Sequence, residues 1–227
     1  MAKKLFITGT GTDIGKTYIA GLIVKKLLEG GYNVGYYKAA MSGNIRRYDG
    51  TLLPGDADFV KRISCSKQDV EEMCPYVYET AVSPHLASRI EKNPIKMEII
   101  EKTFNDVCSK YDYVVVEGSG GILCPISYDG ERIQLEDIVK KFDLPGLLVA
   151  DAGLGTINGV VLTNEYMKNN GMHLNGIIFN NYHPGDVMEE DNLFMCEQMT
   201  GLKVVECVSR GVANMKITAD ELVKLFE

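Results

Sequence analysis

The 227-residue sequence has no long run of apolar residues. After two N-terminal lysines, only residues 5–7 are apolar before Thr8 and Gly9, whereas the hydrophobic region of a secretory signal needs roughly 7–15 such residues. No other segment approaches the roughly 18 apolar residues of a membrane-spanning helix. We therefore expect neither a signal peptide nor a membrane span, and we expect a cytoplasmic protein.

The sequence also lacks clustered metal ligands of the zinc-binding type. Its cysteines and histidines are dispersed, and no two cysteines form a C-x-x-C pair. These residues are Cys65, Cys74, Cys108, Cys124, Cys196 and Cys207, together with His85, His173 and His183. Such spacing argues against a zinc site. In a chain of this size it favours reduced, structural thiols, as in the cytosol.

An excess of positive charge is missing as well. The chain has 24 Lys+Arg against 31 Asp+Glu, a formal net charge of −7. Nucleic-acid phosphates are neutralised by clustered Lys and Arg, so we expect no nucleic-acid partner, although a small anion could still bind in a local basic pocket. The 45% hydrophobic and 24% charged residues are ordinary globular usage, and the length favours one domain over residues 1–227.

Short apolar runs alternate with helical patterns along the chain. The expected strands are residues 5–8, 34–37, 113–116, 146–150, 176–179 and 203–208, and the expected helices are 16–28, 95–110, 135–142, 157–169 and 189–199. Residues 42–55 read as a polar loop, and Thr218 with Glu221 has capping-box spacing. Val-, Ile- and Leu-rich strands separated by helices predict a single doubly wound, mostly parallel α/β domain with helices on both faces. Ligands of such folds bind at the carboxyl ends of the strands.

Residues 9–17, GTGTDIGKT, join the first expected strand to the first expected helix. Gly-Lys-Thr at this place is typical of a P-loop NTPase, in which backbone N–H groups hold phosphates, Lys16 reaches the β- and γ-phosphates and Thr17 binds Mg²⁺. Five residues separate Gly9 from Gly15, instead of the usual four. The alternative is a glycine-rich turn with a surface lysine. Asp13 places a carboxylate near the phosphates, which indicates Mg²⁺, a substrate amine or another subunit close by.

Two further strand ends carry charged residues. Lys38 follows the second strand and is either a second cation of the site or a solvated lysine. Glu117 ends the buried strand 113–116, the position from which a carboxylate completes the oxygen shell of Mg²⁺ with phosphate and Thr17. Asp56 is either another metal ligand or a turn or N-cap residue.

Two later loops have polar binding potential. Residues 151–158 form a glycine-rich loop before a helix, where free N–H groups suit a carboxylate; the alternative is a simple left-handed turn. Asn180 ends the strand 176–179. Its carboxamide could read the donor and acceptor edge of a purine, or it could belong to an Asn-rich turn.

Taken together, these motifs resemble the dethiobiotin synthetase family. GTGTDIGKT, YKAAMSG, GDAD, SPHLAS, VEGSGG, GLGTINGV and IFNNYHP appear in the order found in that family. The resemblance covers essentially the whole chain, with motifs from Leu5 to about Pro184, and the longer phosphate-loop spacing is itself a mark of the family.

The resemblance implies an ATP-dependent ligase with Mg²⁺. It implies that 7,8-diaminononanoate captures CO₂ as a carbamate, that the carbamate attacks the γ-phosphate, and that the second amine closes the urea ring of dethiobiotin. It also implies a homodimer with the substrate carboxylate bound across the interface. Positioning and charge neutralisation should dominate such catalysis.

The same resemblance assigns roles to residues of this sequence. As catalytic groups it gives Lys16, Lys38 and Ser42, and as Mg²⁺ ligands Thr17, Asp56 and Glu117. For the nucleotide it gives Thr12, Asp13, Ile14, Gly15, Lys16, Thr17, Glu117, Gly118 and Asn180. For the substrate it gives Thr12, Lys38, Ser42, Gly155, Thr156, Ile157 and Asn158. The sequence departs from the family at Ala39, where a proline commonly follows the lysine, which puts the rigidity of that loop in doubt.

Two alternatives share the nucleotide-binding half. Partitioning or scaffold-type ATPases usually carry a second lysine early in the phosphate loop, where this sequence has Gly11. Amide-forming cobyrinate-type synthetases ordinarily need a glutamine-hydrolysing domain with a nucleophilic cysteine, for which 227 residues leave no room. We interpret Cys124 as a core or loop residue.

Overall fold

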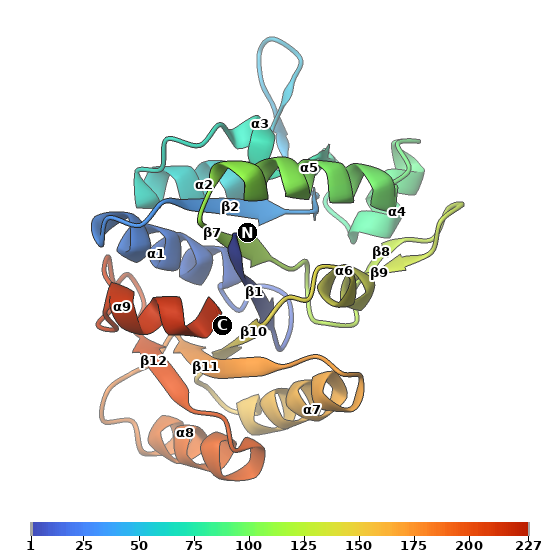
Figure 1. Cartoon of the computed structure of the whole chain (residues 1–227). Helices are drawn as coiled ribbons and strands as arrows, with labels where there is room; N and C mark the ends of the chain where they lie inside the picture. The colour runs from blue at the N-terminus through green and yellow to red at the C-terminus, as the bar shows by residue number, and fades with distance from the viewer. Residues whose placement is uncertain (1, 227) are drawn as a thin grey trace.

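The computed structural model describes residues 2–226, and a six-stranded sheet lies at their centre (Figure 1). Its strands are β1 (Lys3–Gly9), β2 (Val34–Lys38), β7 (Tyr113–Glu117), β10 (Gly146–Asp151), β11 (Leu174–Asn180) and β12 (Val204–Val208). They are ordered β12-β11-β10-β1-β7-β2, and every neighbouring pair is parallel. The strands β2 and β7 lie on one side of β1, and the later strands β10, β11 and β12 lie on the other. The direction in which strands are added therefore reverses at β1, the strand that precedes the phosphate loop.

Helices cover both faces of the sheet. One face carries α1 (Lys16–Glu29), α2 (Gly55–Ser64), α3 (Val70–Met73) and α9 (Ala219–Leu222), followed by a 3-10 turn η1 (Val223–Phe226). The other carries α4 (Pro84–Ile90), α5 (Met97–Lys110), α6 (Leu135–Lys141), α7 (Thr156–Asn169) and α8 (Val187–Thr200). This arrangement confirms the predicted doubly wound α/β fold.

The strands are apolar along their whole length because both faces are buried. Successive side chains of a strand point to opposite faces. In β1, Leu5 and Ile7 pack into the cluster that contains α1, whereas Phe6 packs into the cluster on the other face, and all three are fully buried. Each central strand therefore contributes to two hydrophobic cores, and its carboxyl end is held rigidly between them.

The predicted elements are present. All six expected strands and all five expected helices occur, with boundaries that differ by at most two residues. The capping box at the start of α9 is confirmed: Thr218 Oγ1 accepts from the Glu221 N–H, and the Glu221 carboxylate accepts from the Thr218 N–H.

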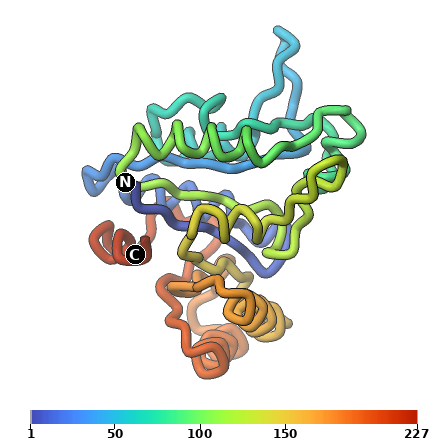
Figure 2. Tube along the Cα trace, turned by 45° about the vertical axis from the view of Figure 1, so that its right-hand side comes forward, coloured from blue at the N-terminus to red at the C-terminus, as the bar shows by residue number. Residues whose placement is uncertain are grey.

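Several shorter elements were not predicted from the sequence. The expected loop 42–55 contains β4 (Ile45–Arg46) and β5 (Leu52–Leu53), an antiparallel hairpin that projects from the body of the molecule (Figure 1, Figure 2). The helices α2, α3 and α4 were not predicted, nor were two further small sheets. One pairs β3 (Ala40–Met41) with β6 (Tyr76–Val77), and the other pairs β8 (Pro125–Ser127) with β9 (Ile133–Gln134).

Helix α2 matters most for the site because it carries Asp56 in its first turn. An acidic residue is favoured there by the helix dipole. The helix packs closely against α1 because Gly21 has no side chain; a Cβ at that position would collide with Ile63. This close approach places Asp56 beside the carboxyl ends of the central strands.

None of the helices within residues 2–226 is long and apolar enough to cross a membrane.

Candidate active site

Two adjoining cavities lie beyond the carboxyl ends of β1, β2 and β7. One has a volume of about 670 Å³ and is lined in part by Gly15, Lys16 and Thr17 of the phosphate loop. The other, of about 530 Å³, extends over β3 and the start of α4. Residues that line both cavities are Thr12, Asp13, Lys38, Ser42, Asp56 and Gly120. A phosphate-binding end and a second end therefore meet at these shared residues.

The phosphate loop leads directly into α1. Gly15 adopts a left-handed conformation with φ of 93° and precedes Lys16, the first residue of the helix. Lys16 Nζ donates to the carbonyl oxygen of Gly11 at 2.6 Å. Burial lowers the pKa of Lys16 from its ordinary value. The Lys16 side chain thus lies folded against its own loop.

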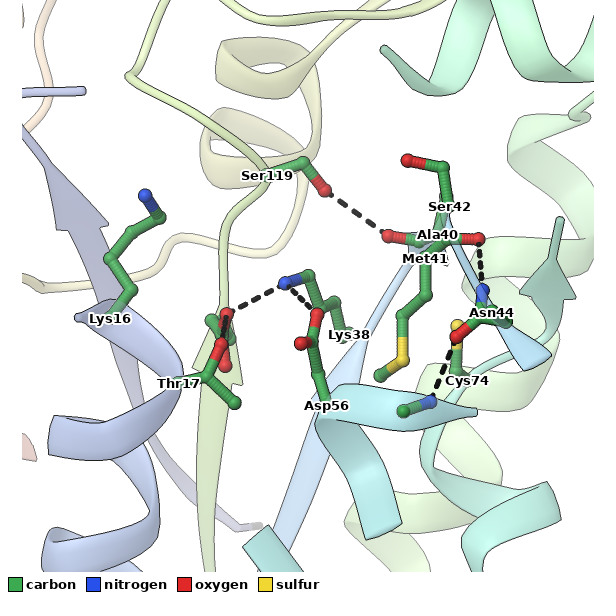
Figure 3. Close-up of polar contacts among 12 residues, drawn as sticks. Lys16, Thr17, Lys38, Ala40, Met41, Ser42, Asn44, Asp56, Cys74 and Ser119 are labelled. Atoms are coloured by element: carbon green, nitrogen blue, oxygen red, sulfur yellow. Dashed lines mark hydrogen bonds and ion pairs between the residues drawn. The ribbon is translucent and has the colours of Figure 1, made fainter. Parts of the chain in front are cut away.

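A buried cluster of charges lies next to this loop. Lys38 and Glu117 are register partners at the ends of β2 and β7. Lys38 Nζ lies 2.6 Å from Glu117 Oε1 and 2.6 Å from Asp56 Oδ2. Thr17 Oγ1 donates to the same Glu117 Oε1 at 2.7 Å. Figure 3 shows the Lys38 ammonium in contact with Asp56, whereas Lys16 extends away from this cluster.

The environment keeps Lys38 charged. Burial alone lowers the pKa of its ammonium, but the negative charges of Glu117 and Asp56 outweigh burial and raise that pKa above its ordinary value. The Glu117 side chain is 1% exposed and that of Asp56 is 39% exposed. Lys38 therefore forms one buried ion pair and one that faces the cavity.

Glu117 has a third hydrogen-bond donor, Tyr36, which the sequence analysis did not identify. The Tyr36 hydroxyl donates to Glu117 Oε2 at 2.7 Å, inside the protein. Burial, reinforced by the charge of Glu117, raises the pKa of Tyr36 well above its ordinary value, so the phenol stays protonated. Both oxygens of the Glu117 carboxylate are therefore satisfied.

Thr17, Asp56 and Glu117 fit a magnesium site shared with a nucleotide. The three side chains offer one hydroxyl and two carboxylates: Thr17 contacts Glu117 directly, and the Lys38 ammonium links Glu117 to Asp56. Hard oxygen donors are what Mg²⁺ selects. Within residues 2–226 no group of three or more His, Cys, Asp and Glu could hold a metal by itself. Mg²⁺ is commonly held by one or two carboxylates together with phosphate oxygens and water. The donor set matches that kind of site.

The loop that carries Ser42 is held from several directions. Ser42 Oγ donates to the carbonyl of Val82 at 2.5 Å, and Ser119 Oγ donates to the carbonyl of Ala40 at 3.1 Å. Asn44, which is buried, donates to the Met41 carbonyl and accepts from the Gly55 N–H. Figure 3 shows the contact of Ser119 with Ala40 and the contacts of Asn44. Ala39 therefore lies in a segment that is fixed by hydrogen bonds without the family's usual proline.

Asn180 connects the phosphate loop to a neighbouring strand end. Its Nδ2 donates to the Ile14 carbonyl at 2.9 Å, and its side chain packs directly on Gly15. Its Oδ1 is buried and has no hydrogen-bond partner in the described part of the chain. An unpaired buried acceptor is costly, but Asn180 lines neither cavity, so its role in reading adenine stays a prediction.

Ile14, Asn180 and the remaining predicted residues do not line these two cavities. Gly118 follows Glu117 and packs against Phe6, and its N–H donates to the Ile7 carbonyl at 2.9 Å. Four residues at the start of α7 line neither cavity, so the structure does not bring them to Lys38. These are Gly155, Thr156, Ile157 and Asn158. Their proposed role in binding the substrate carboxylate stays a prediction.

Replacing Gly15 with alanine tests the contact between the phosphate loop and Asn180. The new Cβ collides with Asn180 Nδ2, and alanine is also strained at the positive φ. We expect nucleotide affinity to fall at least about ten-fold, roughly 1.4 kcal/mol, in calorimetric titrations with ADP. Gly31→Ala is the matched control, because Gly31 has φ of 82° but nothing within 4 Å of a Cβ. It should lose stability and keep its ADP affinity. Wild-type ADP affinity in Gly15→Ala contradicts the assigned role of this contact.

Solved structures with the same fold include a MinC:MinD cell division protein complex from Aquifex aeolicus. That chain matches with a TM-score of 0.59 and 12% identity, over 99% of this chain and 94% of its own length. A ParA family ATPase from Chlorobium tepidum matches with a TM-score of 0.54 and 16% identity, over 92% and 84% of the two chains. Identities this low indicate a shared P-loop fold and nothing more.

Sequence relatives are far more similar. A protein-family model described as an AAA domain matches residues 3–211. An ATP-dependent dethiobiotin synthetase BioD from Brachyspira hyodysenteriae is 46% identical over 228 residues, which is 100% of both chains. A protein of the same name from Clostridium botulinum is 47% identical over 227 residues, covering 100% of this chain and 99% of its own. With these full-length relatives and the P-loop site described above, the chain belongs to the ATP-dependent dethiobiotin synthetase family.

Proposed function

We propose that this chain carboxylates 7,8-diaminononanoate with CO₂ and closes the ring of dethiobiotin with ATP, releasing ADP and phosphate. Family membership supports an ATP-dependent ligase of biotin biosynthesis. The observation that carries the mechanism is the position of Lys38, which lines both cavities and pairs with two carboxylates where they meet. One cavity then takes the phosphates of ATP and the other takes the diamine.

The larger cavity suits the nucleotide. Backbone N–H groups of the phosphate loop and the start of α1 face the phosphates, and Lys16 neutralises their charge. Asn180 offers its unpaired Oδ1 to the amino group of adenine, which guanine does not present at the same edge. The base-binding group is thereby joined to the phosphate loop through Ile14. This supports ATP as the nucleotide.

Thr17, Asp56 and Glu117 are the residues that would hold Mg²⁺. When bound, the ion neutralises charge on the β- and γ-phosphates and polarises the transferred phosphoryl group. The side chains contribute a fixed arrangement of oxygens, because Thr17 and Lys38 already orient Glu117.

The chemistry at the second cavity needs positioning and positive charge. One amine of the substrate attacks CO₂, loses a proton and becomes a carbamate. A carbamate oxygen attacks the γ-phosphorus, the bond to the β-phosphate oxygen breaks, and ADP leaves. The second amine then attacks the carbamate carbon, loses a proton and displaces phosphate, which closes the cyclic urea. We assign Lys38 to the negative charge on the carbamate and the transferred phosphoryl group, and Ser42 as a hydrogen-bond donor to the carbamate. Such electrostatic stabilisation is commonly the largest contribution in reactions of this type.

The substrate carboxylate requires a second binding region. We assign it to the start of α7, where the N-cap residue Gly155 provides no side-chain hydrogen bond to the N–H groups of the first helical turn. Since this turn does not line the cavities of its own chain, we propose that it serves the site of a partner subunit in a homodimer. Two large apolar side chains nearby, Leu154 and Leu162, are 91% and 61% exposed, which supports an interface here.

We also propose a cytoplasmic location. All six cysteines are free thiols, of which Cys74 and Cys196 are buried. Free thiols are typical of reducing compartments, and the proposed reaction needs a supply of ATP.

Substrate dependence of ATP turnover tests the proposed reaction. We expect the protein to release ADP, and to form dethiobiotin, only when diaminononanoate and bicarbonate are both present with Mg²⁺. The measurement is ADP release by a coupled assay, with dethiobiotin followed by mass spectrometry. ATP hydrolysis that is indifferent to both substrates would refute the synthetase assignment and favour a partitioning-type ATPase.

Lys38→Met tests the assigned cation. The substitution keeps the length of the side chain but removes its charge, so we expect kcat to fall by about 10²–10³-fold or more. ADP binding should persist because Lys16 is intact. Lys61→Met is the control and should retain wild-type turnover, because this half-buried lysine of α2 lines neither cavity. Turnover of Lys38→Met close to that of the wild type would contradict the assignment of Lys38 as the catalytic cation.

Light scattering tests the proposed homodimer. The active protein should have about twice the mass of one chain, and Leu162→Arg should shift it toward the monomer and lower kcat/KM for diaminononanoate more than it lowers ADP affinity. The arginine is placed in a surface position and should leave the monomer folded. A monomeric protein with full activity excludes a substrate site shared between subunits.

A further inference from the structure

A chain of buried hydrogen bonds connects the edge of the sheet to the charge cluster. Its members are Gln68, Tyr36 and Glu117, which are 3%, 0% and 2% exposed. Tyr36 lies in β2, two residues before Lys38, and donates from its hydroxyl to Glu117 Oε2. A polar chain that is buried and fully hydrogen-bonded is rigid and costly to interrupt.

Gln68 fixes the backbone of Tyr36. Because β2 is the last strand of the central sheet, one side of its backbone has no neighbouring strand. Gln68 takes that place: its Oε1 accepts from the Tyr36 N–H at 2.8 Å, and its Nε2 donates to the Tyr36 carbonyl at 3.0 Å. The backbone and the hydroxyl of Tyr36 are thus both held, and its ring has little freedom to move.

The two carboxylate oxygens of Glu117 have different hydrogen-bond partners. Oε2 accepts from Tyr36 inside the protein, whereas Oε1 accepts from Thr17 and Lys38 at the cavity. Glu117 lines the cavity that contains the phosphate loop, and Tyr36 does not. Tyr36 therefore acts on ligands only through the carboxylate, by preventing it from rotating away from the phosphate side.

We propose that Tyr36 is a positioning residue for magnesium, which holds Glu117 so that Oε1 faces the nucleotide phosphates. This inference rests on the proposed function, since it takes Glu117 as a metal ligand. Partners of metal-binding carboxylates typically change metal affinity 10- to 100-fold when they are removed.

The next residue of the same strand provides a matched control. Tyr37 is also 0% exposed, but its side chain packs into the core on the opposite face of the sheet. Its hydroxyl donates to the Ile100 carbonyl at 3.1 Å and shares a hydrogen bond with Thr103 Oγ1. Replacing either tyrosine with phenylalanine removes one buried hydroxyl, and only Tyr36 contacts Glu117.

The test measures metal binding without turnover. Mn²⁺ binding to the protein–ADP complex is followed by electron paramagnetic resonance for the wild type, Tyr36→Phe and Tyr37→Phe. We expect Tyr36→Phe to raise the Kd of Mn²⁺ by 10- to 100-fold and Tyr37→Phe to change it less than about two-fold. ADP affinity without metal should be equal in all three proteins. An unchanged Kd in Tyr36→Phe, or an equal rise in Tyr37→Phe, overturns the proposal.

Gln68→Met is a second variant in case Tyr36→Phe does not fold. It leaves the tyrosine in place but frees its backbone, and we expect a several-fold weaker binding of Mn²⁺; a wild-type Kd counts against the proposal. Neither variant needs diaminononanoate for its readout. Absence of dethiobiotin formation by the wild type would therefore refute the proposed function. A rise of the Mn²⁺ Kd in Tyr36→Phe and Gln68→Met, but not in Tyr37→Phe, would still support the positioning role.

Discussion

The burial of one carboxylate, that of Glu117, determines how the site is built. Taking a carboxylate out of water costs several kcal/mol unless hydrogen bonds and opposite charge compensate. Thr17, Lys38 and Tyr36 supply that compensation, and each comes from an element adjacent to β7 or from the helix that follows β1. The strand order β1-β7-β2 is what brings these donors together, since it places the Glu117 strand between the strand of the phosphate loop and the strand of Lys38. The electrostatic stabilisation of Glu117 therefore depends directly on the order of the strands in the sheet.

The charges of the phosphate cavity nearly cancel. Its lining includes the cations Lys16, Lys38 and Arg62 and the acids Asp13, Asp56 and Glu117. The cavity is consequently not a basic pocket that would bind a polyphosphate by charge alone. The proposed Mg²⁺ would change this balance, because it would bind to the same acids and add positive charge where ATP carries its negative charge. The composition of the cavity therefore supports the proposed use of Mg²⁺ by a site in an acidic protein.

Much of this site could be predicted from the sequence. The apolar runs identified every central strand, and since parallel strands end at one edge of a sheet, Lys16, Thr17, Lys38 and Glu117 were expected to lie together. Asp56 was ambiguous because helix α2 was missed: its motif begins with a glycine and two acids that read as a turn. Tyr36 was missed for another reason. An aromatic residue in an apolar strand normally indicates core packing, and no periodic pattern shows that its hydroxyl meets a glutamate 81 positions later. Gln68 and Asn44 are similar cases, in which a long-range polar contact depends on tertiary packing alone.

The start of α7 illustrates a different limit of sequence motifs. The order of motifs along a chain does not tell whether two of them meet within one molecule, and residues 155–158 lie outside both cavities that Lys38 lines. The proposed substrate has amines at one end and a carboxylate at the other, joined by a flexible hydrocarbon chain. In the proposed site, Lys38 and Ser42 contact only the reacting end of the substrate, so they do not discriminate between hydrocarbon chains of different length. If the carboxylate is bound by a second subunit, the distance between the two subunits becomes the measure of substrate length. Selectivity for the substrate would then depend on the packing of exposed apolar residues such as Leu154 and Leu162, which are remote from any reacting atom.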